Sequence, residues 1–176
     1  IYNKRIFFKA PEYGDLVVFK TPQDNRTDYI KRLIGIPGDT IQFVNGQLFL
    51  NENKIEREKI NSKFNIRCAS TILDVNVYKE TLPNGASYIA VYRKNETMMN
   101  TDKYIVPANH YFLLGDNRDC SKDSRFLNSV GYVDRLNLVG KAKIVFFSND
   151  TLQGSVLKFW NWNDSLRLKR FFKRIW

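Results

Sequence analysis

The dipeptide Asn45-Gly46 is the feature of this sequence that most restricts the fold. It lies between two short apolar runs, residues 40–44 and 47–50. An Asn-Gly pair accepts the positive φ angles of a tight turn between antiparallel strands, which most residue pairs do not. The sequence therefore predicts a β-hairpin at this point and a β-rich fold around it.

Other short runs rich in β-branched and aromatic residues, each bounded by turn residues, continue this pattern along the chain. They are residues 15–19, 28–33, 88–92, 104–106, 111–114 and 140–147. Residues 54–102 are looser in pattern and richer in Asn, Lys, Glu and Thr, which indicates an inserted β-rich subdomain. We therefore predict a mostly β protein whose antiparallel, barrel-like core comprises residues 1–53 and 103–176.

The C-terminal tail changes character. Its apolar side chains fall at helical spacing opposite its basic ones, which predicts a short basic amphipathic helix over residues 164–176. The apolar set is Leu168, Phe171, Phe172 and Ile175, and the basic set is Arg167, Arg170, Lys173 and Arg174. Such a helix either lies on an anionic lipid surface or packs on the core with its charges in water.

Composition limits the function classes. The chain has 176 residues, of which 43% are hydrophobic, so it can bury one main core. Its net charge of +10 favours an anionic partner, either a nucleic acid or a lipid surface. Two cysteines and one histidine make a zinc site unconvincing, and they are compatible with one disulfide without implying it. No apolar run approaches the ~20 residues that cross a bilayer.

Two local features stand out as candidates for chemistry. Lys31 lies inside an otherwise apolar strand, and an eleven-residue polar loop, GDNRDCSKDSR, covers residues 115–125. Alone, each has an ordinary explanation: a lysine whose stem lies along an edge strand, and a turn held by internal salt bridges. His110, the single histidine, is expected at the surface rather than in a catalytic triad.

Together these features resemble the bacterial type I signal peptidases, the membrane-anchored proteases that remove signal peptides from exported preproteins. The matching segments are YIKRLIGIPGD (29–39) and GDNRDCSKDSR (115–125), supported by GDLVVFKTP (14–22) and VGKAKIVFFS (139–148). They span most of the chain outside the predicted insertion. The resemblance implies an exported catalytic region at the bacterial plasma membrane, on its outer face.

The resemblance also implies roles for individual residues. Lys31 would be the general base of a Ser/Lys dyad, and Ser121 would hydrogen-bond to it. Asp123 and Arg125 would form the salt bridge that shapes the loop, with Asp116 and Arg118 as structural support. Ile30 would line the pockets for the small residues before the cleavage site, with Tyr29 a weaker candidate. Cys120 stands where the family usually has Asn.

A lysine can serve as a base only when its amine is neutral. At the reference pKa of ~10.4, about one lysine in two thousand is neutral at pH 7, so the site must lower that pKa by burial. A free carboxylate beside Lys31 would have the opposite effect. We therefore expect the nearby acids of the loop to be paired with Arg118 and Arg125.

The family's nucleophile lies in a Ser-Met-x-Pro-Thr box upstream of the lysine. Residues 1–30 contain no serine, and the chain starts Ile-Tyr-Asn-Lys, without an initiator Met or signal peptide. We therefore expect a piece of a longer protein that lacks the nucleophile and the membrane anchor and is inactive alone. No metal or cofactor is expected, and the expected partners are preprotein signal peptides and membrane lipid.

Two rival functions stay open at this point. A non-catalytic basic β domain that binds nucleic acid would also explain the charge and the aromatic residues, although the charge is scattered among acids. Conjugation peptidases and self-cleaving repressors also use a Ser/Lys dyad. Among the dyad proteases, the extended loop at 115–125 favours the signal peptidases.

Overall fold

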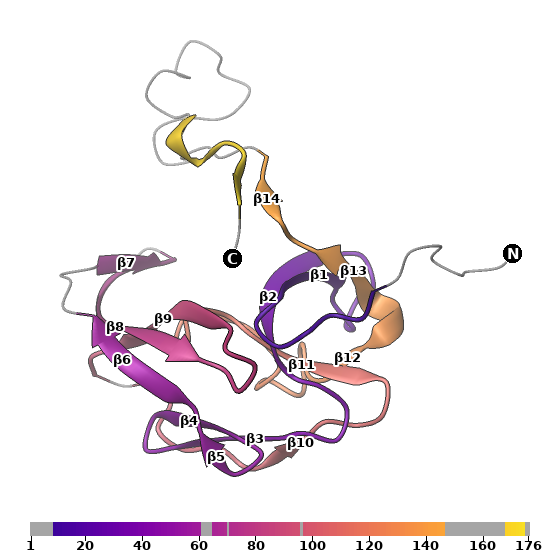
Figure 1. The fold of residues 1–176 in the computed structure, drawn as a ribbon, viewed down its shortest axis with the longest axis horizontal. Coiled ribbons are helices and arrows are strands. Elements are labelled where there is room, and N and C mark those ends of the chain that lie inside the picture. The colour runs from indigo at the N-terminus through magenta and orange to yellow at the C-terminus, as the bar shows by residue number, and fades with distance from the viewer. Residues whose placement is uncertain (1–8, 61–64, 70, 96, 147–167, 175–176) are drawn as a thin grey trace, which may run out of the picture. The chain divides into compact units, whose positions relative to one another are not determined.

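The computed structural model describes residues 9–60, 65–69, 71–95, 97–146 and 168–174. The chain divides into two compact units, residues 1–141 and residues 142–176. The described strands are mostly antiparallel and form open sheets, without closing into a barrel. The mostly β class predicted from the sequence is confirmed. Figure 1 shows the strands of the larger unit, with β6, β8 and β9 on one side and β1, β2 and β13 on the other.

The first sheet of the larger unit has five strands and carries Lys31. Its order is β12 (Val133–Asp134), β11 (His110–Leu114), β2 (Asp28–Gly35), β1 (Leu16–Lys20) and β13 (Leu138–Lys141). A 3-10 turn, η1 (Arg135–Asn137), joins β12 to β13. Buried and partly exposed residues alternate along β1, so that Val17 and Phe19 face the core. This alternation is the period-2 burial expected of a strand with one face on the core.

The second sheet contains the predicted hairpin. Its order is β10 (Tyr104–Ile105), β3 (Thr40–Val44), β4 (Gln47–Leu50) and β5 (Asn53–Lys54). Val44 pairs with Gln47 across a two-residue turn, and Asn45 and Gly46 have φ angles of 50° and 69°. The hairpin prediction is therefore confirmed, for the reason that motivated it: both turn residues occupy the left-handed region.

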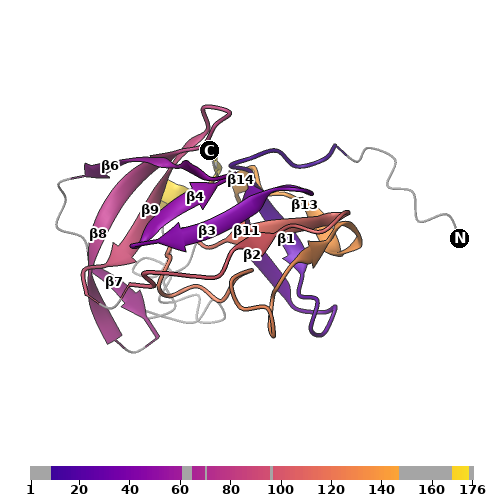
Figure 2. The same cartoon turned by 90° about the horizontal axis from the view of Figure 1, so that it is seen from below.

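The predicted insertion forms a third sheet. Its strands are β6 (Glu56–Ile60), β7 (Asn65–Cys68), β8 (Thr71–Thr81) and β9 (Ser87–Arg93), with β8 paired to the other three. Figure 2 shows β8 and β9 running side by side as the longest ribbons of this sheet. A disulfide joins Cys68 of β7 to Cys120 of the polar loop, with their Cα atoms 5.8 Å apart. The sequence had left this pairing open.

The hydrophobic core connects the insertion to the rest of the larger unit. One cluster combines buried residues of all three sheets, including Ile34 of β2, Phe43 of β3 and Ala90 and Tyr92 of β9. A second cluster lies around β1, β11 and Leu33, and a third lies within the insertion. The third sheet therefore shares its main core with the other two. The division into a core and an inserted subdomain stays a prediction.

The smaller unit corrects the predicted C-terminal helix. Its described part contains β14 (Ile144–Val145), a 3-10 turn η3 (Leu168–Arg170) and β15 (Lys173–Arg174), which pairs with β14. Phe172 has a φ of 55°, which ends helical geometry, and its ring packs edge-to-face on Phe146. Over residues 168–174 a single 3-10 turn followed by a short strand thus takes the place of the predicted amphipathic helix. The predicted residues 164–167 and 175–176 lie outside the described part.

Within the described residues, no helix combines the length and the apolar character needed to cross a membrane.

Candidate functional site

Lys31 lies on β2, opposite Val17 of β1, with a half-buried side chain. Burial lowers the pKa of the Lys31 amine below its ordinary value, because a low-dielectric environment disfavours the charged form. Asp123 and Asp116 act to raise this pKa, and Arg125 acts to lower it. Burial is the largest of these effects, so the net result is a pKa below the ordinary lysine value.

Tyr29 shares a face of β2 with Lys31. The Lys31 ammonium lies 5.3 Å from the centroid of the Tyr29 ring, a contact that favours the charged amine and so works against burial. The same ring packs edge-to-face on Phe19, with centroids 6.1 Å apart, and contacts the second core cluster. Tyr29 is therefore largely a packing residue. Ile30 points to the opposite face and is 48% exposed.

The half of β2 that carries Lys31 has one open edge. β11 pairs with β2 only between Arg32 and Gly35, so no described strand pairs with Asp28–Lys31 on that side. The N–H of Leu33 donates to the carbonyl of Asp15, and the C=O of Leu33 accepts the N–H of Gly14. Both backbone groups of Leu33 therefore point to the side of β1. Because successive residues of a strand point their backbone groups to alternate sides, the N–H and C=O of Ile30 face the open edge. An extended peptide can form hydrogen bonds there.

The polar loop is closed by an ion pair between Asp123 and Arg125, both buried. Arg125 Nε and Nη2 each lie 2.8 Å from a carboxylate oxygen of Asp123. Asp123 also accepts the backbone N–H of Gly115, and the Ser124 hydroxyl accepts the N–H of Leu113 at 2.9 Å. These contacts fix the second half of the loop against the end of β11. The ion pair implied by the resemblance is thus present.

Asp116 has a different partner from the expected one. Arg32 of β2 binds it with two parallel hydrogen bonds of 2.7 Å, from Nε and Nη2. Arg118 instead turns into the insertion and pairs with the buried Glu80 of β8. The expectation that Arg118 and Arg125 would occupy the acids near Lys31 is therefore correct for Asp123 and wrong for Asp116. The physical outcome is the same, since both carboxylates are neutralised by a guanidinium.

Ser121 lies beside Gly115 and makes no hydrogen bond to Lys31 in this structure. Its hydroxyl is buried and has no hydrogen-bond partner among the described residues. A Cβ added to Gly115 would lie 2.0 Å from Ser121 Oγ, so the hydroxyl fills the space that a side chain at Gly115 would take. Extending the pairing of Arg32 with Leu114 by one residue places Gly115 opposite Lys31. Ser121 therefore occupies the same face as Lys31.

Sequence reasoning missed three residues that hold the loop: Glu80, Tyr88 and Tyr92, all buried in the insertion. The one signal available was an acidic residue at an inward position of an alternating strand. It also left open the Cys68–Cys120 disulfide, which attaches the residue before Ser121 to β7.

His110 contacts the carbonyl of Ala108 and lies 3.8 Å from Asp134, in line with a surface role.

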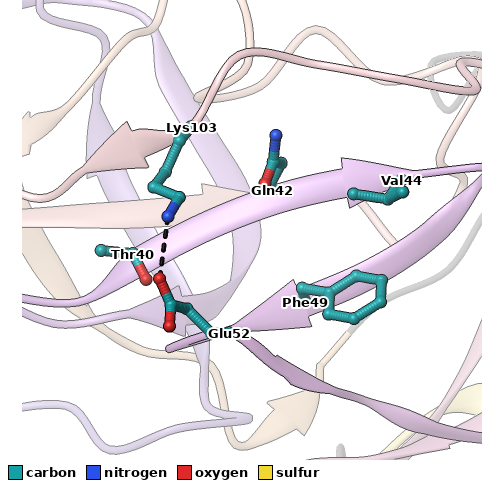
Figure 3. Close-up of a pocket in the computed structure, with 6 residues that line it drawn as sticks. All are labelled: Thr40, Gln42, Val44, Phe49, Glu52 and Lys103. Atoms are coloured by element: carbon teal, nitrogen blue, oxygen red, sulfur yellow. Dashed lines mark hydrogen bonds and ion pairs between the residues drawn. The ribbon is translucent and has the colours of Figure 1, made fainter.

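Several hollows lie on the larger unit. One of about 290 Å³ adjoins the polar loop and is lined by Met98, Arg118, Asp119, Ser121, Arg125 and Phe126. A second, of about 340 Å³, lies on the second sheet and is lined by Thr40, Gln42, Val44, Phe49, Glu52 and Lys103 (Figure 3). An ion pair of 2.9 Å between Lys103 and Glu52 closes one end of it. The first of these hollows contains three residues implied by the resemblance, Arg118, Ser121 and Arg125.

The described residues contain no cluster of three or more His, Cys, Asp or Glu side chains arranged to hold a metal ion.

Comparison with known proteins gives consistent results. The family described as "Signal peptidase, peptidase S26" matches residues 1–147. Signal peptidase I of Rickettsia typhi is 38% identical over 192 residues, which cover 100% of this chain and 70% of the relative. Signal peptidase I of Rickettsia massiliae is 38% identical over 193 residues, with the same coverage. A crystal structure of a signal peptidase I from Enterococcus faecalis V583 aligns with a TM-score of 0.48 and 27% identity, covering 77% of this chain and 98% of that one.

Proposed function

Because this chain belongs to the signal peptidase, peptidase S26, family, we propose that it forms the base-carrying part of a serine endopeptidase that removes signal peptides from exported preproteins. In this proposal Lys31 is the general base of a Ser/Lys dyad. The observation that carries it is the position of Lys31: a half-buried amine at the open edge of a strand, with a lowered pKa. A neutral lysine at such an edge can accept a proton from a hydroxyl beside a bound peptide.

The neighbouring charges support this role. Asp123 is bound by Arg125, and Asp116 is bound by Arg32, so neither carboxylate is left to pair directly with the Lys31 amine. A direct ion pair would stabilise the ammonium and raise the pKa of Lys31. The loop thus keeps two acids close to the base while their charge is largely compensated.

Ser121 is the proposed orienting group for that base. Its hydroxyl is buried on the same face as Lys31 and has no other described partner, so nothing competes for its hydrogen bond. A neutral hydroxyl can hydrogen-bond to the amine without placing a negative charge beside it, so it raises the pKa of Lys31 less than a carboxylate would. We propose that this bond forms in the assembled enzyme.

The nucleophile in this proposal is the serine of a Ser-Met-x-Pro box, a sequence that residues 1–176 do not contain. The serine attacks the scissile carbonyl while Lys31 takes its proton; the protonated lysine then returns a proton to the leaving amine. Residues 1–176 alone are therefore proposed to be inactive. Attachment to the outer face of the bacterial plasma membrane belongs to the same proposal.

The substrate is proposed to bind as an added strand along the open edge of β2. Backbone hydrogen bonds to Ile30 would hold the peptide extended, so that alternate side chains enter shallow pockets. The exposed Ile30 side chain would form part of one pocket wall. A wall of this kind suits small residues before the cleavage site, as expected for signal peptides.

Cleavage of a preprotein by two forms of the protein tests the proposal. The first form is residues 1–176, and the second is the protein extended upstream to include a Ser-Met-x-Pro box. We expect cleavage only by the extended form, with loss on Lys31→Met. Turnover by residues 1–176 alone, or full activity of the extended Lys31→Met variant, would contradict the proposal.

A further inference from the structure

The polar loop is attached to the insertion by a fully buried group of charged and phenolic side chains. Glu80 of β8 is 0% exposed and Arg118 of the loop is 1% exposed. Arg118 Nη2 donates to Glu80 Oε2 at 2.7 Å. The hydroxyls of Tyr88 and Tyr92 each donate to Glu80 and accept a hydrogen bond from Arg118. Burial raises the pKa of both tyrosines, so their protons stay available for donation to Glu80.

The backbone of the loop is also held by β9. Val91 donates its N–H to the carbonyl of Asp116 and accepts the N–H of Arg118, both at 2.9 Å, which forms a short parallel bridge. The N–H of Arg93 donates to the carboxylate of Asp119 at 2.8 Å. The first half of the loop is therefore a continuation of the inserted sheet, while its second half is fixed to β11.

A short chain of contacts connects Glu80 to the surroundings of Lys31. The carbonyl of Arg118 accepts a hydrogen bond from Arg125 Nη2, and Arg125 binds Asp123. Asp123, Arg125 and Asp116 are the charged groups that act on Lys31, with the ring of Tyr29 on its own strand. Arg118 is thus linked, through its own carbonyl, to Arg125 and Asp123, which are two of these charged groups.

We propose that Glu80 is a positioning residue of the peptidase reaction: through Arg118 it fixes the loop that packs beside Lys31. The proposal rests on the function assigned above and gives the insertion a part in catalysis. A purely structural role is the alternative, in which the pair only fills the core. The geometry favours positioning, because Glu80 and the two tyrosines orient the Arg118 guanidinium in a way that an apolar side chain would not.

The expected effect of losing the Glu80 carboxylate follows from burial. Without its counter-ion, the buried Arg118 guanidinium is unpaired, and moving it toward solvent displaces the loop. Water then reaches Lys31, and the pKa of its amine rises toward the ordinary lysine value. Each unit of that rise reduces the neutral fraction about tenfold at pH values below the pKa.

Titration of Lys31 in residues 1–176 tests the inference without requiring activity. The amine is followed by NMR with ¹³C-labelled lysine and assigned by the missing signal in Lys31→Met. We expect Glu80→Gln to raise the pKa of Lys31, Glu80→Asp to raise it less, and the control Glu58→Gln to leave it unchanged. Glu58 is an exposed glutamate on β6, in the same sheet.

The outcomes separate this inference from the function on which it rests. A folded Glu80→Gln protein in which Lys31 titrates as in the unchanged chain would overturn the positioning role. If Glu80→Gln does not fold, the test uses Glu80→Asp, which keeps the charge. An unchanged pKa of Lys31 in that variant would likewise overturn the positioning role. In the extended enzyme we expect Glu80→Gln to lower kcat by up to ~100-fold with little change in KM, as for a small misplacement of a catalytic group. Activity retained by Lys31→Met would remove the proposed function but not the coupling of Glu80 to Lys31.

Discussion

The two halves of β2 differ although they belong to one continuous strand. Arg32–Gly35 are all buried and pair with β1 or its preceding residues on one edge and with β11 on the other. Asp28–Lys31 alternate between exposed and half-buried and pair only with β1 among the described strands. One half therefore contributes to the core, and the other presents a lysine and free backbone groups. In the proposed function, the buried half holds the open half and its lysine in place.

The largest expected effect comes from replacing Lys31 in the open half. In the extended enzyme, Lys31→Met and Lys31→Arg should both reduce activity to background, because Met has no base and guanidinium is never appreciably deprotonated. Thermal unfolding should show that both variants stay folded, since the Lys31 side chain lies outside the buried half. A folded Lys31→Arg enzyme with substantial activity would show that the lysine acts by charge and not as a base.

Two substitutions by alanine, one in each half of β2, test the comparison through the free energy of unfolding. Leu33 is 0% exposed and belongs to a core cluster, so Leu33→Ala should lower the free energy of unfolding by about 2–5 kcal/mol. Ile30 is 48% exposed, and Ile30→Ala should change it by less than about 1 kcal/mol.

Denaturant unfolding of residues 1–176 measures the change in stability of the Leu33→Ala and Ile30→Ala variants. In the extended enzyme, Ile30→Ala should instead alter the preference for residues before the cleavage site. Equal losses of stability in the two variants would show that the halves are not distinct.

A smaller effect is expected at Ser121, which faces the open half from the loop. Ser121→Ala in the extended enzyme should lower kcat by ~10- to 1000-fold, the range for one lost catalytic hydrogen bond. Stability should not fall, because the buried hydroxyl has no described partner to lose. Steady-state kinetics and thermal unfolding measure the two quantities. Unchanged kcat would show that Ser121 does not orient Lys31.

Much of this arrangement could be predicted from the sequence, since it depends on local patterns. The Asn45-Gly46 turn and the β-branched and aromatic run in β1 indicate conformations that neighbouring residues determine by themselves. Lys31 could be picked out because a charged residue interrupts an apolar strand. The ion pair of Asp123 with Arg125 joins residues two positions apart.

The parts that could not be predicted depend on residues far apart in the chain. Arg32 and Asp116 are 84 positions apart, and Arg118 and Glu80 are 38 apart. Periodicity shows which face of a strand is buried, but not which other strand covers that face. The predicted tail helix was wrong over residues 171–174 for a related reason. The helical spacing of Phe171 and Phe172 contains no information about the pairing of β14 with β15.

The pKa of Lys31 is the measurement that tests the account most directly. This pKa can be measured in two ways: by the NMR titration of the amine in residues 1–176, and by the pH dependence of kcat/KM in the extended enzyme. Because the neutral amine is the active form and its pKa is lowered, activity should be full above this pKa and fall as the pH decreases through it. We expect both midpoints below the ordinary lysine pKa and close to each other. A Lys31 that titrates at the ordinary value, or activity that persists well below its measured pKa, would contradict the assignment of Lys31 as the base.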